Sequence, residues 1–288
     1  MTAFRHVAVI GAGTMGHGIA YVAALAGHQV RLADADAATL ERGLQRIRTS
    51  FDTAIAKGKC TPHQRDAALG ALTTCGAAID AARDADLVIE AVPEKLELKK
   101  RLFAELEPVV APNAVLASNT SSLSITAIAS ALTHQDRVIG MHFFNPVPVM
   151  KLLELVRGER TSDDVVERAR AFAERIGKTP IIVRDTPGFA TSRLGVVLGL
   201  EAIRMLEQGV ASAEDIDRAM ELGYNHPMGP LRLTDLVGLD VRLAIAEHLH
   251  ATFGDDTYRP PELLRRLVAE GRLGKKSGHG FYRWETST

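Results

Sequence analysis

The first part of the chain alternates short apolar segments with longer amphipathic ones. Several apolar segments are continuous rather than interleaved with polar residues, which is typical of strands whose sheet is covered by helices on both faces. We expect strands at His6–Ile10, Gln29–Ala33, Asp86–Ala91, Ala114–Ala117, Arg137–Met141, Leu152–Val156 and Pro180–Val183. We expect helices at Met15–Ala26, Ala38–Ala56, Pro62–Leu69, Glu97–Glu107, Ser124–Ala131 and Asp163–Ile176. This order predicts βαβ units around a parallel sheet.

The pattern changes at Asp185, after which no segment resembles a strand and helical periodicity takes over. Apolar residues then recur at helical spacing and predict one face of a helix over residues 188–208. These residues are Val196, Val197, Leu200, Ile203 and Leu206. We therefore expect an α/β domain over residues 1–184 and an all-α domain over residues 185–288.

Capping residues indicate further helices in the C-terminal part. Ser212 and Asp215 form a capping-box pattern, which marks the start of a helix, and Gly223 suits its C-terminal end. Another helical segment follows over Asp240–Thr252.

Composition excludes several classes of protein. The 288 residues are 46% hydrophobic and 24% charged, which is ordinary for a globular chain and excludes a disordered or fibrous protein. The net charge of −1 supplies no positive excess for binding nucleic acid or an anionic membrane surface. Cys60 and Cys75 form no CxxC motif, and His248 and His250 have no third ligand at a recognisable spacing. We expect a reducing compartment and no metal site.

No targeting segment is evident in the sequence. The longest apolar candidate, Ile19–Gly27, is far shorter than the roughly 20 residues that span a bilayer. The apolar stretch Val7–Ile10 near the N-terminus is too short for a signal peptide and runs into glycines. We therefore expect a soluble, cytoplasmic protein.

A glycine-rich motif follows the first expected strand and opens the first helix. Its G-x-G-x-x-G spacing comprises Gly11, Ala12, Gly13, Thr14, Met15 and Gly16. Gly11 permits a tight turn, Gly13 lets a pyrophosphate approach the backbone, and Gly16 lets the helix pack close to its strand. Asp34 ends the second strand, where a carboxylate can accept hydrogen bonds from an adenosine ribose. The motif predicts NAD binding; the alternative is a glycine-rich turn of some other α/β protein.

Two residues suit the oxidation of a secondary alcohol. His142 follows the expected strand Arg137–Met141, and neutral imidazole suits reversible proton transfer at neutral pH. Glu154 lies inside the apolar segment Leu152–Val156, where a carboxylate is costly without a partner. We predict that the two side chains pair. The alternatives are a structural histidine and an exposed glutamate on an edge strand.

Ser121 is a candidate hydroxyl donor beside the substrate oxygen. It lies in a Ser/Thr cluster after the strand Ala114–Ala117, and the alternative is that it caps the next helix. We expect Ser122 or Ser124 to be the cap, which leaves Ser121 available.

At this point the chain resembles the L-3-hydroxyacyl-CoA dehydrogenase family, especially its short-chain 3-hydroxybutyryl-CoA dehydrogenases. The resemblance covers nearly the whole chain and rests on five segments in the family's order. They are Gly11–Ala20, Ser118–Ser122, His142–Val147, Asp185–Phe189 and Gly274–Gly278. It implies an N-terminal NAD-binding domain, a helical dimerisation domain, an acyl-CoA substrate and a homodimer.

The resemblance also implies roles for individual residues. His142 is the base, oriented by Glu154, and Ser121 and Asn145 contact both substrate and cofactor. Glu94, Lys99 and Lys276 match cofactor-proximal positions. For Glu94 and Lys99 the alternative is a solvated helix start; for Asn145 it is a turn before Pro146.

The sequence departs from the family pattern at Ser192, where the best-known members carry a substrate-contacting asparagine. The residues that contact the CoA phosphates in the family cannot be matched securely to positions of this sequence either. Arg42, Arg46 and Arg48 are only candidates for them, and a solvated helix face is the better explanation of these arginines.

Two other functions are compatible with the sequence. One is a gulonate dehydrogenase of the lambda-crystallin type, which keeps the fold but acts on a CoA-free hydroxy acid. The other is a non-catalytic dinucleotide-binding protein.

Overall fold

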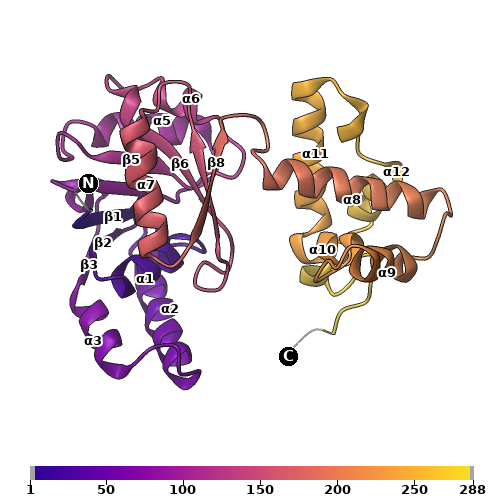
Figure 1. Cartoon of the computed structure of the whole chain (residues 1–288), viewed down its shortest axis with the longest axis horizontal. Helices are drawn as coiled ribbons and strands as arrows, with labels where there is room; N and C mark the ends of the chain where they lie inside the picture. The colour runs from indigo at the N-terminus through magenta and orange to yellow at the C-terminus, as the bar shows by residue number, and fades with distance from the viewer. Residues whose placement is uncertain (1–3, 286–288) are drawn as a thin grey trace. The chain divides into compact units, whose positions relative to one another are not determined.

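The structure is a computed structural model and describes residues 4–285. The chain divides into two compact units between Thr186 and Pro187, and each unit is described by itself (Figure 1).

The first unit is an eight-stranded sheet with helices on both faces. The strands are β1 (His6–Ile10), β2 (Gln29–Ala33), β3 (Leu72–Cys75), β4 (Leu87–Glu90), β5 (Val115–Ser118), β6 (Val138–Phe143), β7 (Leu152–Arg157) and β8 (Thr179–Arg184). The helices are α1 (Gly16–Leu25), α2 (Ala37–Ala56), α3 (Pro62–Gly70), α4 (Ala78–Ala82), α5 (Leu96–Leu106), α6 (Ile125–Ala129) and α7 (Asp163–Arg175). The strand order is β3-β2-β1-β4-β5-β6-β7-β8, which makes β1 and β4 neighbours and reverses the direction of strand addition between them.

Alternate strand residues divide between the two faces of the sheet. Val7, Ile89, Met141 and Leu155 belong to the core that packs against α1, α2, α3 and α7. Their neighbours along each strand point to the opposite face because side chains alternate along a strand. Strands β1 to β6 are mutually parallel, so their carboxyl ends meet at one edge of the sheet.

Two features of this sheet correct the sequence-based expectation. Strand β3 and helix α4 were not expected, since the Leu-Thr-Thr-Cys of β3 is short, half polar and only partly buried at the edge of the sheet. The sheet is also not wholly parallel, because β7 runs antiparallel to β6, and β8 runs parallel to β7. Only residues 144–151 join β6 to β7, which is too short for the crossover that a parallel pair requires.

The second unit is helical. It contains α8 (Thr191–Glu207), α9 (Ala213–Gly223), α10 (Pro230–Val237), α11 (Leu239–Phe253) and α12 (Glu262–Ala269). Its core includes Val196, Leu200 and Ile203 of α8, as the apolar periodicity predicts. The expected fold class, a Rossmann-type α/β domain followed by an all-α domain, is confirmed.

The start of α9 differs in detail from its expected capping box. The Ser212 hydroxyl oxygen accepts a bond from the Asp215 N–H at 3.1 Å, so Ser212 is the N-cap. The Asp215 carboxylate accepts from the Ser212 hydroxyl instead of from a backbone N–H, since an aspartate is one methylene shorter than the glutamate of a capping box. A reciprocal box occurs instead at the start of α3, between Thr61 and Gln64.

Within residues 4–285, no helix has both the length and the apolar character needed to cross a membrane.

Candidate active site

The glycine-rich loop joins β1 to α1 at the carboxyl edge of the sheet. Gly11 has a φ of 98°, and a Cβ there would lie 2.7 Å from the carbonyl oxygen of Ala91. A Cβ on Gly16 would lie 1.6 Å from the carbonyl oxygen of Gly11, so both positions require glycine. A Cβ on Gly13, by contrast, would meet no atom within 4 Å. The loop is therefore closed towards the protein and open at Gly13, which fits the approach of a dinucleotide phosphate.

Ala12, Thr14 and Met15 complete this loop. The N–H of Ala12 donates to Asp34 Oδ2 at 2.8 Å, and the N–H of Asp36 donates to Asp34 Oδ1 at 2.9 Å. Asp34 is thus held beside the loop by both of its carboxylate oxygens. This is where an adenosine ribose would lie if its phosphates met the loop at Gly13.

His142 and Glu154 form a buried pair across two antiparallel strands. His142 lies within β6 rather than after it, and the strand register places Glu154 of β7 directly opposite. Imidazole Nδ1 lies 2.7 Å from Glu154 Oε2, and Glu154 is 0% exposed. Strand β7 is flanked by β6 and β8, so Glu154 is not the exposed edge-strand residue of the alternative reading.

Ser121 lies in the loop after β5 and is held through its backbone. Its N–H donates to Glu94 Oε1 at 3.0 Å, and the hydroxyl of Thr120 donates to the same oxygen. Ser124 is the N-cap of α6, as the sequence allowed, so the Ser121 side chain is not used for capping. Burial alone would raise the pKa of Glu94, but the Thr120 hydroxyl, the Lys99 ammonium and the Ser121 N–H together hold that pKa below its usual value.

Lys99 is not part of a solvated helix start. It is 1% exposed, and its Nζ lies 2.8 and 2.9 Å from the two carboxylate oxygens of Glu90 and 3.2 Å from Glu94 Oε2. Glu90 ends β4, is also fully buried, and accepts from the Ser118 hydroxyl. Glu90 is not among the residues predicted from the sequence, although its place at the end of the continuous apolar segment Leu87–Ile89 indicates a buried carboxylate.

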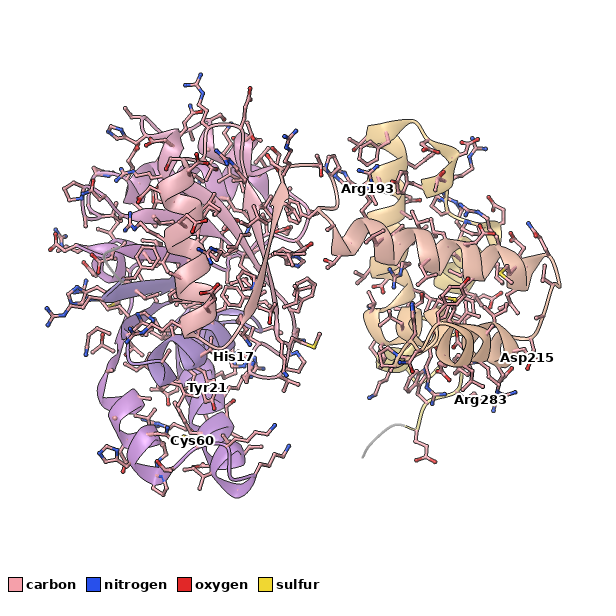
Figure 2. The ribbon with its side chains drawn as sticks, viewed as in Figure 1. His17, Tyr21, Cys60, Arg193, Asp215 and Arg283 are labelled. Carbon is pink, nitrogen blue, oxygen red and sulfur yellow. The ribbon has the colours of Figure 1, made fainter. Side chains whose placement is uncertain are left out.

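Asn145 lies in the loop between β6 and β7, is exposed, and lines a cleft in the first unit. The cleft has a volume of about 570 Å³ and is lined by α1, the end of α2 and this loop. Figure 2 labels His17 and Tyr21, which line the cleft from α1. Lys178 is buried beneath the loop, where its ammonium donates to the carbonyl oxygens of Val147 and Met150.

Lys57 and Lys59 add two further cationic side chains to the lining of this cleft. The three candidate arginines do not line it, and Arg42 contacts Thr39 and Asp36 on the exposed face of α2 instead. The solvated-face interpretation of Arg42 therefore fits the structure.

The two remaining candidates belong to the helical unit. Lys276 Nζ lies 2.5 and 2.7 Å from the two carboxylate oxygens of Asp240. Ser192 lies in the first turn of α8 and is partly exposed. Across residues 4–285, no group of three or more His, Cys, Asp or Glu side chains could hold a metal ion.

Comparison with known proteins gives matches along nearly the whole chain. Residues 6–186 match the model of the NAD-binding domain of 3-hydroxyacyl-CoA dehydrogenase, and residues 188–284 match the model of its C-terminal domain. A probable 3-hydroxybutyryl-CoA dehydrogenase of Bacillus subtilis is 46% identical over 99% of this chain and 99% of its own. Human mitochondrial hydroxyacyl-coenzyme A dehydrogenase is 43% identical over 98% of this chain and 91% of its own. The crystal structure of (S)-3-hydroxybutyryl-CoA dehydrogenase from Ralstonia eutropha superposes with a TM-score of 0.94 at 43% identity, covering 99% of this chain and 100% of that one.

Proposed function

Because the chain belongs to the 3-hydroxyacyl-CoA dehydrogenase family and is an NAD-dependent enzyme of that type, we propose that its substrates are short-chain (S)-3-hydroxyacyl-CoA thioesters, oxidised reversibly to 3-oxoacyl-CoA. The buried pair of His142 and Glu154 is the observation that supports an enzyme over a non-catalytic dinucleotide-binding protein, because it holds an imidazole ready for proton transfer. The relatives named 3-hydroxybutyryl-CoA dehydrogenase support the short-chain thioester as substrate.

His142 is the general base in the direction of oxidation. The Glu154 carboxylate can only accept a hydrogen bond, so the proton of the neutral ring resides on Nδ1 and the basic nitrogen is Nε2. Nε2 takes the hydroxyl proton, and the Glu154 carboxylate stabilises the imidazolium that forms. NAD, when bound, supplies the hydride acceptor.

The polar side chains of the neighbouring loops orient the substrate. The Ser121 hydroxyl donates to the substrate oxygen and holds it beside the base. The Asn145 amide contacts substrate and cofactor, and Lys178 fixes the loop that carries Asn145. Ser192 is a candidate for a substrate contact only, because it stands where the best-known members of the family carry a substrate-contacting asparagine and its side chain is shorter.

The cofactor is held by the loop Gly11–Gly16, by Asp34, and by Glu94 with its neighbours. Lys99 acts through the carboxylates that it joins, since its ammonium is already bonded to Glu90 and lies against Glu94. Lys276 is a further cofactor-proximal cation.

The 570 Å³ cleft accommodates the CoA part of the substrate. Its wall combines apolar side chains, among them Val22 and Leu25, with the ammonium groups of Lys57 and Lys59. That combination suits a ligand with an apolar pantetheine arm and anionic phosphates.

The test is an assay of the purified protein with NADH and acetoacetyl-CoA, followed by one with NAD and gulonate. We expect rapid oxidation of NADH in the first assay and no reduction of NAD in the second. Turnover of gulonate without turnover of acetoacetyl-CoA would favour the hydroxy-acid alternative, and inactivity in both would favour a binding protein.

We also propose that the enzyme is cytoplasmic and forms a homodimer through the helical unit.

A further inference from the structure

Glu90, Glu94 and Lys99 form a cluster of three charged side chains at the carboxyl end of β4. Lys99 Nζ lies 2.8 and 2.9 Å from the two oxygens of Glu90 and 3.2 Å from Glu94 Oε2. Glu90 and Lys99 are enclosed, at 0% and 1% exposure, whereas the Glu94 side chain is 38% exposed. The cluster therefore has one open side, which is formed by Glu94. It lies at the edge of the sheet where dinucleotide folds bind their ligands.

The hydrogen bonds of Glu90 show that it is a carboxylate. Its two oxygens accept from the Lys99 ammonium, from the Val92 N–H at 3.1 Å and from the Ser118 hydroxyl. An ammonium and a backbone N–H can only donate, so these contacts leave no acceptor for a carboxyl proton. Burial of this charge is tolerated because Lys99 lies beside it.

Glu94 adds a second carboxylate to the same ammonium. Its Oε1 accepts from the Thr120 hydroxyl and from the Ser121 N–H at 3.0 Å. Burial works against its charge, but the Thr120 hydroxyl, the Lys99 ammonium and the Ser121 N–H hold the pKa of Glu94 below its usual value. Two carboxylates thus share one ammonium, and the cluster keeps one uncompensated negative charge on its open side.

The glycine-rich loop lies against the same segment of the chain. A Cβ on Gly11 would lie 2.7 Å from the carbonyl oxygen of Ala91, the residue that follows Glu90. Strands β1 and β4 are paired, with Ile10 opposite Glu90. A dinucleotide whose phosphates meet this loop therefore lies next to the strand that carries the cluster.

The proposed function also places the nicotinamide near this charge. The Ser121 hydroxyl donates to the substrate oxygen, and the backbone of the same residue is bonded to Glu94. Hydride transfer brings the reacting carbon of the substrate into contact with the nicotinamide ring, at about 3–3.5 Å. In a productive complex the ring then lies within roughly 10 Å of the Glu94 carboxylate.

We propose that the cluster of Glu90, Glu94 and Lys99 makes the enzyme discriminate between the two redox forms of its cofactor, by stabilising the positively charged ring of NAD⁺ and not the neutral ring of NADH. This inference rests on the proposed function, and within it on the place of Ser121 beside the substrate oxygen. At an effective dielectric constant of about 20, one charge at this distance from another changes an affinity by about tenfold.

The discrimination has a consequence for the bound complexes. The equilibrium of the overall reaction is fixed by its free reactants, so the cluster cannot change it. It shifts the balance of the bound species towards NAD⁺ with the 3-hydroxyacyl thioester, relative to NADH with the 3-oxoacyl thioester.

The experiment measures the dissociation constants of NAD⁺ and NADH separately by isothermal titration calorimetry, for the wild type and for Glu94→Gln. The amide keeps the shape of the side chain and removes the negative charge. Any hydrogen bond to the cofactor that is lost weakens both forms and cancels in the ratio of the two constants. Removal of the charge weakens NAD⁺ alone, so the ratio of Kd for NAD⁺ to Kd for NADH should rise by about tenfold.

Glu90→Gln provides a second variant with the same net charge. Glu90 is enclosed, so it acts on the cofactor only through its charge and through the side chains that it holds. The ratio should rise in this variant too, and circular dichroism shows whether it folds. If it does not fold, Glu94→Gln decides alone. The matched control is Glu97→Gln, the same change at an 82% exposed position of α5 that lies 3.5 Å from Lys100, and it should leave both constants unchanged.

A purely structural role of the cluster would raise both dissociation constants in Glu94→Gln by the same factor, and this outcome contradicts the proposal. An unchanged ratio, or an equal change of the ratio in Glu97→Gln, contradicts it as well. Failure of the broader proposed function is seen separately, as a wild type that binds both cofactor forms but does not reduce acetoacetyl-CoA. The two dissociation constants would still decide the inference in that case.

Discussion

At the scale of single residues, the pair of His142 and Glu154 determines which imidazole nitrogen does chemistry. A carboxylate 2.7 Å from Nδ1 keeps the proton there and orients the ring, so the basic nitrogen is Nε2. His142→Gln should therefore lower kcat by about 10²–10⁴-fold. The dissociation constant for NADH, measured by fluorescence titration, should stay within a few-fold of the wild-type value. A variant that keeps more than about a third of wild-type turnover would show that another group is the base.

Glu154→Gln tests the orienting role separately. The amide retains an oxygen that can accept from Nδ1–H but loses the negative charge that stabilises imidazolium. We expect a smaller loss than for His142→Gln, about tenfold to a hundredfold in kcat, with NADH binding again retained. A loss of NADH binding in either variant would place the pair in the cofactor site instead.

Asp34 leads to a prediction about the choice of cofactor. Its two carboxylate oxygens are both held by backbone N–H groups, so the charge is fixed beside the glycine-rich loop. A phosphate on the 2′ position of the adenosine ribose would meet this charge and that of Asp36, and the residue after Asp34 is alanine, not arginine. We expect kcat/KM with NADH to exceed that with NADPH by about a hundredfold or more. Asp34→Ala should narrow the ratio, and equal values in the wild type would contradict the assignment of Asp34.

At the scale of elements, His28 joins the N-terminal segment, α1, β2 and α7. It is buried, its Nδ1 lies 2.8 Å from the carbonyl oxygen of Phe4, and its ring packs against Phe172 of α7. The Nε2 atom is buried without a hydrogen-bond partner, so protonation there would create a cation with no acceptor. Burial lowers the pKa of His28 below 6.5; the bond to Phe4 opposes this effect, and the charge of Arg175 adds to it.

This lowered pKa predicts how stability depends on pH. In the window below pH 6.5 the unfolded chain binds more protons at this residue than the folded chain does. The free energy of unfolding should therefore decrease as the pH falls from 7.5 to 5.5. Urea unfolding followed by circular dichroism at both pH values measures the change. His28→Gln should reduce it and the exposed His63→Gln should not; an unchanged slope in His28→Gln would contradict the prediction.

The periodic pattern predicts most elements of this fold, but it contains little information on pairing. Seven of the strands were predicted because they are short, mainly apolar segments, whereas Thr73 and Thr74 in β3 make that strand look like a loop. The direction of β7 depends on the length of the segment 144–151, not on the composition of the strand.

In the candidate site, too, some features could be predicted from the sequence and others could not. Glu154 could be identified because it lies between apolar residues in the sequence. Its pairing with His142 was predicted because a buried carboxylate without a partner destabilises the fold. The environment of Lys99 could not be predicted in this way, because its partner Glu90 ends a different strand and the two meet only when β4 and α5 pack. The position of Glu90 at the end of an apolar segment indicates a buried carboxylate, but it does not identify Lys99 as the partner.

At the scale of the whole molecule, the exposed apolar side chains of the helical unit bear on assembly. Leu194, Val210, Leu222 and Tyr224 are between 59% and 79% exposed. Large apolar side chains that together form an exposed patch mark a protein interface. We expect a homodimer, with a mass near 2 × 31.0 = 62.0 kDa by light scattering at micromolar concentration. A mass near 31.0 kDa under those conditions would contradict the prediction.

The antiparallel register of β6 and β7 has a consequence for how sequence change affects this enzyme. A slip of one residue would turn Glu154 to the other face of the sheet and bring Leu153 or Leu155 opposite His142. The same slip would remove Leu153 and Leu155 from the core against α1 and α7, so it would also cost the unit much of its stability. Folding and proton transfer therefore depend on one alignment of two strands. Core substitutions in β6 and β7 should reduce the amount of folded enzyme while each folded molecule keeps its specific activity. A catalytic group on an independent loop can change its position without a change in the core. In this strand pair, a substitution that shifts the catalytic pair also shifts the core residues beside it.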